Sequence, residues 1–245
     1  MPVIALQGIR GGTGTTSVTA GLAWALRRQG KRVLVIDFSP DNQLRLHFNS
    51  SVSLAEGWAR AELDAQPWHQ AALCYENGLD FLPFGQLSVA EYHHWLAQHQ
   101  QAPERWVQYL SQLRDGGDYG WLLLDFPASG PACTEQWREI ADVVLCVLTA
   151  DANSHIRLYQ QPLPLGIRLL LNQFSADSRL QQDLQQYWQQ HLNALLPVSI
   201  HRDEAMAEAL AAKQPVGAYD AASLAADELN ILASWCRAHV SGVRS

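Results

Sequence analysis

Lysine is almost absent from this sequence. Only Lys31 and Lys213 are lysines, so nearly all of the 17 basic residues are arginines, and 24 acidic residues give the 245-residue chain a formal net charge of -7. Non-specific binding to DNA needs a basic face that neutralises phosphates, so this charge balance makes DNA binding unlikely to be the function. The total charge does not say where the arginines lie, so it does not exclude a local basic patch.

Cysteine pairs and long apolar runs are also missing. The cysteines, Cys74, Cys133, Cys146 and Cys236, form no CxxC pair and show no metal-ligand spacing, which predicts reduced thiols in a cytosolic protein. No apolar stretch approaches the roughly 18 residues of a membrane span. The N-terminus lacks the basic region of a signal peptide, and the C-terminal stretch has few cations. We expect a soluble, cytoplasmic chain without direct membrane insertion.

Short apolar runs alternate with helical patterns along the chain. Runs such as VLVI, WLLL and VVLCVL are typical of strands buried on both faces of a parallel sheet. The alternation predicts a doubly wound α/β fold, a mostly parallel sheet with helices on both faces, as a single domain over residues 1–245. The predicted strands are Val3–Leu6, Arg32–Ile36, Leu79–Pro83, Trp121–Leu124, Val143–Leu148, Arg168–Leu171 and Val198–Ile200. The predicted helices are Thr16–Gln29, Pro103–Asp115, Thr134–Ile140, Arg179–Leu195, Glu204–Lys213 and Ala222–His239.

The segment from Gln86 to Gln108 is the least regular part of the sequence. Its histidines, His93, His94 and His99, have no carboxylate or cysteine at matching spacing, so the segment is interpreted as a solvated helix or loop rather than a metal site. The tryptophans of the middle region are interpreted as core residues, although an exposed pair would mark a partner surface. They are Trp58, Trp68, Trp95 and Trp106.

A glycine-rich turn, GIRGGTGTTS, lies between the first predicted strand and the first predicted helix. Gly11, Gly12 and Gly14 allow a tight backbone whose N–H groups converge on phosphates at the positive end of the helix. Thr16 stands where a hydroxyl would coordinate Mg²⁺, whereas Thr15 takes the place of the usual lysine. On these residues alone, a plain βα turn without a ligand remains an equal alternative.

Polar residues end three of the buried strands. VLVID ends at Asp37, WLLLD ends at Asp125 and RLLLN ends at Asn172. In a parallel sheet these ends lie at the edge where α/β proteins bind ligands. A carboxylate there can hold the Mg²⁺ shell of a nucleoside triphosphatase, although one alone is equally a helix cap. Three such residues following the glycine-rich turn favour a nucleotide site.

Taken together, these residues resemble the MinD/ParA class of P-loop ATPases, whose loop reads KGGxGKT[ST]. Asp37 matches the acidic residue after the second strand, Asp125-x-Pro127 matches the switch after the Walker B strand, and Asn172 matches the asparagine that reads adenine. The segment from Pro197 to Val216 is similar to the one that flanks the base, and Arg202 is expected near the adenine. The loop aligns as Arg10, Gly11, Gly12, Thr13, Gly14, Thr15, Thr16 and Ser17.

A narrower resemblance is to the BcsQ family, the MinD-like proteins encoded with bacterial cellulose synthase. It is carried by RGGxGTT, SPDNQLRLHFN, LDFLPFGQLS, DANSHIRL and IHRDEAMAEALAAKQPVG. The resemblance implies ATP and Mg²⁺ as cofactors and a homodimer formed across ATP. It also implies a place in the cellulose synthase complex at the inner membrane, reached through partners, with the small protein BcsR and the c-di-GMP sensor BcsE among them.

The loop departs from the ATPase pattern at three positions. Thr15 removes the cation that bridges the β- and γ-phosphates, Arg10 replaces the lysine that in this class reaches across a dimer, and Ser39 replaces an aspartate that orients water. Positioning groups of that kind are worth on the order of 10²–10⁴ in rate. We therefore expect ATP binding with slow or negligible hydrolysis, which leaves enzyme activity undecided. Arg10, Asp37 and Asp125 are the candidate catalytic residues, and Thr16, Asp37 and Asp125 the candidate metal ligands.

The main alternative is an active ParA or MinD-type cycling ATPase in DNA partition or cell-pole positioning. Charge, Thr15 and Ser39 argue against it, and the C-terminal stretch is not the basic amphipathic helix of a membrane cycler. A small-molecule kinase or reductase on the same fold lacks a pocket signature. Asp151, Asn153 and Arg157, in a predicted loop, are either near the nucleotide and dimer seam or simply caps and a surface arginine. His201 is interpreted as a packing residue.

Overall fold

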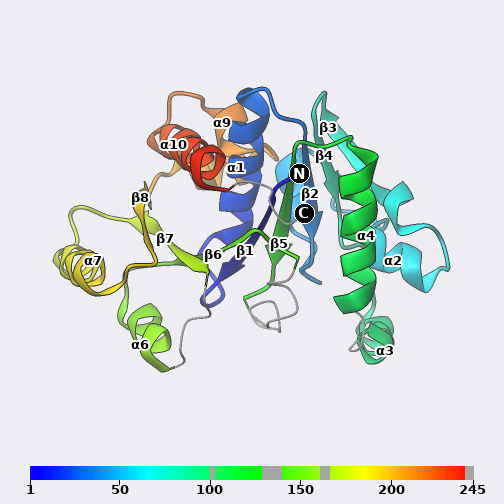
Figure 1. Ribbon diagram of the computed structural model, residues 1–245, viewed down its shortest axis with the longest axis horizontal. Coiled ribbons are helices and arrows are strands. Elements are labelled where there is room, and N and C mark those ends of the chain that lie inside the picture. Colours follow the sequence, from blue (N-terminus) through cyan, green and yellow to red (C-terminus); the bar gives the residue numbers. More distant parts are fainter. Residues whose placement is uncertain (100–102, 129–139, 161–165, 241–245) are drawn as a thin grey trace.

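A computed structural model describes residues 1–99, 103–128, 140–160 and 166–240 (Figure 1). Its centre is an eight-stranded sheet in the order β3-β4-β2-β5-β1-β6-β7-β8. Among the described residues every strand pairing is parallel except that of β3 with β4, which confirms the predicted mostly parallel α/β sheet. The strands are β1 Val3–Gly8, β2 Val33–Asp37, β3 Leu73–Glu76, β4 Leu79–Leu82, β5 Trp121–Phe126, β6 Val143–Leu148, β7 Ile167–Phe174 and β8 Leu195–His201.

The helices cover the sheet on both faces, as the sequence predicts. One core cluster joins Val33, Val35 and Leu123 to α1 and α10, while another joins Leu34 and Ile36 to the helices of the opposite face. Successive residues of one strand thus enter opposite cores, which explains the uninterrupted apolar runs. The helices are α1 Thr15–Arg28, α2 Trp58–Leu63, α3 Val89–His99, α4 Pro103–Gly116, α6 Ala152–Gln160, α7 Arg179–His191, α8 Ala205–Ala211, α9 Val216–Tyr219 and α10 Leu224–His239, with 3-10 turns η1 Leu44–Phe48 and η2 Trp68–Ala71.

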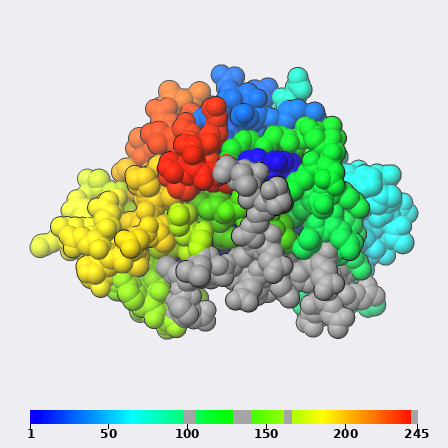
Figure 2. Space-filling view, viewed as in Figure 1, coloured from blue at the N-terminus to red at the C-terminus, as the bar shows by residue number. Residues whose placement is uncertain are grey.

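Helices from the two ends of the chain lie side by side on the first face. Figure 1 shows α10 against α1, and in Figure 2 the red C-terminal helix borders blue N-terminal residues. Glycines lie where α1 meets two other helices: a Cβ on Gly21 of α1 would fall 2.5 Å from Leu229 Cδ1 of α10, and one on Gly217 of α9 would fall 2.7 Å from Trp24 Cδ1 of α1. A side chain at either position would require the neighbouring Leu229 or Trp24 side chain to shift.

Most predicted elements are confirmed, and the differences have local causes. The helix predicted over Arg179–Leu195 ends at His191, since Leu195 begins β8. The loop predicted to carry Asp151 and Arg157 is largely helix α6, capped by Asp151 Oδ1, which accepts a hydrogen bond from Ser154 N at 2.8 Å. The helix predicted over residues 134–140 falls almost wholly outside the described residues.

The sequence interpretation missed two features of the middle region. The antiparallel edge strand β3 turns into β4 through Asn77 and Gly78, a hairpin signal that the pattern did contain. Helix α2 lies where no helix was assigned, whereas α3 lies in the segment interpreted as a solvated helix or loop and shows it to be a helix over Val89–His99. The middle tryptophans are core residues as expected, with Trp58, Trp68 and Trp106 less than a tenth exposed.

Candidate functional site

The glycine-rich loop joins β1, the central strand, to α1. Gly12 has φ +80° and Gly14, at the N-cap of α1, has φ +79°, a left-handed conformation that side chains rarely adopt. The loop follows a strand flanked by β5 and β6. It therefore lies at the centre of the carboxyl edge of the sheet, as the sequence predicts.

Arg10 and Thr13 hold two carbonyl groups of the loop. Arg10 Nη1 donates to Gly11 O at 2.8 Å, and Thr13 Oγ1 donates to Arg10 O at 3.2 Å. Thr13 Oγ1 also lies 3.1 Å from the hydroxyl of Thr15, the residue at the lysine position. In this loop, which lacks the usual lysine, hydrogen bonds within the loop help to fix its shape.

Two amides from β7 hold the next two carbonyl groups. Asn172 Nδ2 donates to Thr13 O at 2.7 Å, and Gln173 Nε2 donates to Gly12 O at 3.2 Å. Four consecutive loop carbonyls, from residue 10 to residue 13, are therefore bound by side chains. The first N–H groups of α1 have no acceptor within the helix, and they remain available to an anion.

Asp37 and Asp125 lie opposite each other on neighbouring strands and are fully or almost fully buried. Burial raises the pKa of Asp37 well above its usual value, and the nearby charge of Asp125 raises it further. Burial raises the pKa of Asp125 to about 7, although the hydroxyls of Thr16 and Thr19 counteract the shift. Two carboxylates cannot both be ionised in such surroundings without a cation, so the pair favours a bound positive charge.

The two carboxyl groups differ in their partners. Asp37 Oδ1 accepts from Ser39 N at 2.8 Å and Oδ2 accepts from Leu44 N at 3.2 Å, so this side chain also caps the chain after β2. Asp125 Oδ1 accepts from Thr19 Oγ1 at 3.1 Å. Asp125 Oδ2 is buried and has no hydrogen-bond partner in the described part of the chain. That oxygen is the atom most suited to a metal-bound water or a metal ion.

The side chain of Arg10 is bound within its own chain. Its Nη2 donates to Asp151 Oδ2 at 2.5 Å and to Thr149 Oγ1 at 3.0 Å. Burial raises the pKa of Asp151, but hydrogen bonds from Thr149, Ser154 and Arg10 outweigh it and bring the pKa to about 2. Asp151 is therefore the cap of α6, which was one of the two alternatives from the sequence, and it is also the ionic partner of Arg10, which the sequence did not indicate.

An open cleft of about 500 Å³ lies in front of the loop. His47 of η1 faces it, 3.5 Å from Ser17 Oγ, and burial lowers the pKa of this imidazole to about 4. Asn172 and Arg202 do not line the cleft; Arg202 is exposed and its N–H donates to Phe174 O at 2.8 Å. The lining comprises residues 10–17, Ser39, Asp41, Gln43, His47, residues 126–128, Arg157 and Leu210.

The structure thus brings together the loop, Asp37, Asp125 and Asn172, and adds residues that the sequence did not single out. Thr19 and Gln173 are the clearest of these, since each binds a predicted site residue or its loop. Thr19 was detectable, because it lies one helical turn after Thr15 on α1. His201, predicted to pack, contacts Phe174 and is bound through its backbone and ring to Glu228.

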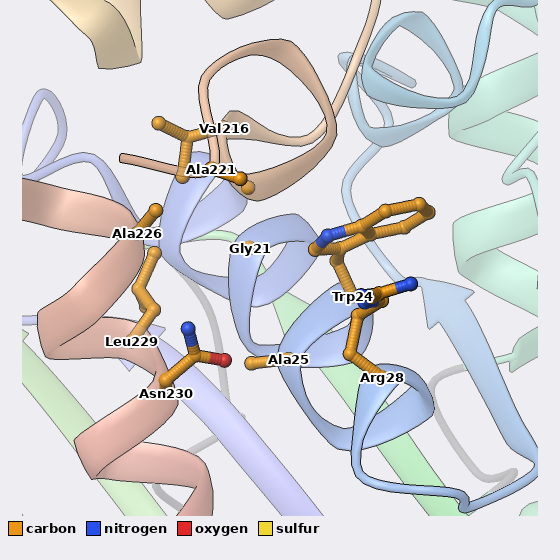
Figure 3. Close-up of a pocket in the computed structure, with 10 residues that line it drawn as sticks. Gly21, Trp24, Ala25, Arg28, Val216, Ala221, Ala226, Leu229 and Asn230 are labelled. Carbon is orange, nitrogen blue, oxygen red and sulfur yellow. The ribbon is translucent and has the colours of Figure 1, made fainter. Parts of the chain in front are cut away.

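A second hollow, of about 230 Å³, lies between α1, α9 and α10 (Figure 3). Trp24 and Arg28 border one side and Leu229 and Asn230 another, and none of its lining residues belongs to the cleft. Between these larger side chains the lining is completed by small residues, Gly21, Ala25 and Gly217 among them. In the described part of the chain, no three His, Cys, Asp or Glu side chains are grouped to hold a metal, and no helix is long and apolar enough to cross a membrane.

The fold has relatives among solved structures. The MinC:MinD cell division protein complex of Aquifex aeolicus has a chain with a TM-score of 0.76 and 17% identity, covering 100% of this chain and 99% of that one. MinD of Pyrococcus horikoshii, solved with Mg-ADP, gives 0.73 and 20%, covering 96% and 95%. Cobyrinic acid a,c-diamide synthase of Mycobacterium smegmatis, solved with an ATP analogue and magnesium, gives 0.74 and 19%, covering 98% and 95%.

Similarity in sequence is much closer to one family. The family model described as cellulose biosynthesis protein BcsQ matches residues 1–237. The BcsQ proteins of Escherichia coli K12 and Salmonella typhimurium LT2 are each 48% identical, over 252 and 249 residues, covering 100% and 99% of this chain and 98% and 96% of theirs. With the loop and strand ends of a MinD/ParA-like fold in place, the chain belongs to the BcsQ family of cellulose biosynthesis proteins.

Proposed function

We propose that the cleft binds Mg-ATP and that the chain acts as an ATP-dependent homodimer, an assembly, regulatory and localisation factor of the bacterial cellulose synthase secretion system. One observation carries the proposal: four consecutive loop carbonyls are held by side chains, which leaves the N–H side of the loop free for phosphates. Membership of the BcsQ family supports the place in cellulose synthesis. We also propose that residues 1–245 form one nucleotide-binding domain, since both core clusters pack on one sheet.

The residues below the loop fit a magnesium ion. Mg²⁺ is usually held by one or two carboxylates together with substrate phosphates and water, so no larger protein cluster is needed. Asp125, with its unpartnered Oδ2, and Thr16 would hold the ion, and Asp37 would add charge from the next strand. When bound, the ion would neutralise phosphate charge. The solved relatives with Mg-ADP and with an ATP analogue and magnesium support this choice of ligand.

Hydrolysis is expected to be slow or negligible. Thr15 supplies no cation to the β- and γ-phosphates, and its hydroxyl lies beside that of Thr13. Ser39 lines the cleft where a carboxylate would position water, and its N–H is bound to Asp37 Oδ1. ATP would then act mainly as a ligand that stabilises a dimer, because a ligand that binds only the assembled form favours that form by mass action.

Arg10 is the residue proposed to reach the nucleotide of a second subunit. In the single chain it is bound to Asp151, Thr149 and the Gly11 carbonyl, so it must leave these partners to act across a dimer. The ion pair is partly exposed, with side chains 27% and 34% accessible, and such pairs contribute roughly 0–1 kcal/mol. The guanidinium can therefore exchange Asp151 for phosphate oxygens at little energetic cost.

Partners are expected to bring the dimer to the inner membrane. BcsR and BcsE remain the expected partners from the family resemblance, and recruitment through them requires no membrane span in this chain. DNA binding is not part of the proposal, given the net charge of -7. An active cycling ATPase is the second candidate, and the rate of phosphate release separates the two.

The test is the mass of the purified full chain by light scattering, with and without Mg-ATP, alongside phosphate release. Wild type should double its mass with Mg-ATP and release phosphate slowly, whereas Arg10→Ala should remain a monomer. Asp151→Asn is the matched variant, since it frees Arg10 and retains an N-cap residue for α6; it should dimerise at a lower ATP concentration. Rapid turnover by wild type would favour the cycling ATPase, and absence of ATP binding would overturn the proposal.

A further inference from the structure

Strand β7 is irregular at the point where it meets the loop. Gln173 has φ +56°, and the register with β8 shifts between Leu171 and Phe174. In a regular strand, consecutive side chains point to opposite faces of the sheet. Here the consecutive residues Asn172 and Gln173 both donate to the loop, to carbonyls of neighbouring residues. The bulge therefore redirects one side chain that a regular strand would have turned away.

Both amides also close around the glycine that begins α1. A Cβ built on Gly14 would fall 2.7 Å from Asn172 Nδ2 and 3.2 Å from Gln173 Nε2. The two nitrogen atoms thus lie on the same side of the loop, against a residue whose own φ is +79°. A left-handed glutamine is unfavourable by itself, and strained residues of this kind concentrate at functional sites.

We propose that the bulged end of β7 is a brace for the phosphate loop and that Gln173 is a positioning residue for nucleotide binding. The inference rests on the proposed function, because it concerns the same cleft. By holding the Gly12 carbonyl away from the ligand, Gln173 keeps the loop N–H groups directed towards phosphate oxygens. A loop that lacks its lysine depends on such neutral contacts for its shape, and Gln173 contributes one without touching the nucleotide.

Two substitutions separate this positioning role from a structural one. Gln173→Gly removes the amide and also relieves the left-handed strain, so the ligand-free chain should melt at the wild-type temperature or above it. The same variant should bind Mg-ATP about 2- to 10-fold more weakly, as expected for the loss of one hydrogen bond. Gln173→Met retains the length and the strain but cannot donate, and should lose affinity by a similar factor. Gln186→Met, on an exposed position of α7, is the control and should change neither quantity.

Two quantities are measured for each variant: the Mg-ATP affinity, by calorimetry, and the melting temperature of the ligand-free full chain. The brace is supported if Gln173→Gly melts at or above the wild-type temperature and yet binds Mg-ATP more weakly. A residue needed only for folding would not change the two quantities in this way. Wild-type affinity in both Gln173 variants would overturn the brace and leave the proposed function intact. Absence of Mg-ATP binding by wild type would instead overturn the proposed function together with the brace.

Discussion

The two sides of strand β1 surround the loop with different chemistry. On the side of β5 and β2 lie the buried carboxyl groups of Asp125 and Asp37, whose pKa values burial raises and one of whose oxygens has no partner in the described structure. On the side of β6 and β7, neutral amides of Asn172 and Gln173 are bound to loop carbonyls. The first side is electrostatically incomplete without a cation, whereas the second is complete without any ligand.

The two sides should therefore respond differently to substitution. Substitutions on the carboxylate side should alter ligand binding and stability in opposite directions, because the unliganded protein bears the cost of burying charge. Substitutions on the amide side should act through the shape of the loop.

Asp125→Asn should have the largest effect. The amide is close in shape but removes a buried charge beside Asp37, so the ligand-free chain should gain about 1–3 kcal/mol in its free energy of unfolding. Mg-ATP affinity should fall on the order of 100-fold through loss of the candidate metal ligand. Chemical denaturation and calorimetry measure the two changes, and Asp118→Asn, an exposed aspartate, is the control. A destabilised Asp125→Asn that still binds Mg-ATP would contradict the contrast.

Gly14→Ala should disrupt the contacts of the Asn172 and Gln173 amides with the loop. The new Cβ would meet both amide nitrogens within 3.2 Å at a left-handed position, so unfolding should become easier by about 2–4 kcal/mol and Mg-ATP affinity should drop. Gly30→Ala is matched to it, because Gly30 has φ +80° and nothing within 4 Å of its ideal Cβ, and it should cost only about 1 kcal/mol. Equal losses of stability in Gly14→Ala and Gly30→Ala would show that the two amides are not in close contact with Gly14.

His47 gives the carboxylate side a pH dependence. Its pKa is about 4 in the folded chain and about 6.5 when unfolded, so below pH 6.5 the unfolded state binds the proton and folding is weakened. Between pH 7 and pH 5, wild type should lose about 2 kcal/mol more unfolding free energy than His47→Gln. Denaturation at both pH values measures this, with exposed His93→Gln as the control. Parallel pH profiles for wild type and His47→Gln would disprove it.

Asp151→Asn should have the smallest effect on stability of the ligand-free chain. Hydrogen bonds stabilise the Asp151 carboxylate, but the ion pair with Arg10 is partly exposed and asparagine still caps α6, so the free energy of unfolding should fall by no more than about 1 kcal/mol. Denaturation curves of the two proteins check this. A loss above about 2 kcal/mol would mean that Asp151 is needed for folding rather than for holding Arg10.

Sequence patterns located the parts of the site that depend on strand order and residue type. β6 runs over Val143–Leu148 as predicted, because an uninterrupted apolar run between polar residues defines both ends. Asp37 and Asp125 were placed correctly at the carboxyl ends of their strands, and because these strands are parallel neighbours the two residues lie side by side. The binding roles assigned to Asn172 and Arg202 stay predictions.

What the sequence could not show depends on backbone geometry. Gln173 reaches the loop only because its φ is +56° in a bulge, and nothing in the pattern RLLLNQF signals that bulge. The early end of α7 at His191 follows from the register of β8, a contact with a distant part of the sheet. The ion pair of Arg10 with Asp151 joins residues 141 positions apart, beyond the reach of local spacing.

The side-chain bonds to the loop carbonyls have a kinetic consequence. Because the loop takes its shape as the chain folds, the entropy of ordering it is lost before any nucleotide arrives. The nucleotide then binds to a preorganised loop. Its association rate should be limited by diffusion and charge rather than by rearrangement of the loop. Partner proteins that regulate the bound state would then act on the dissociation rate of the nucleotide.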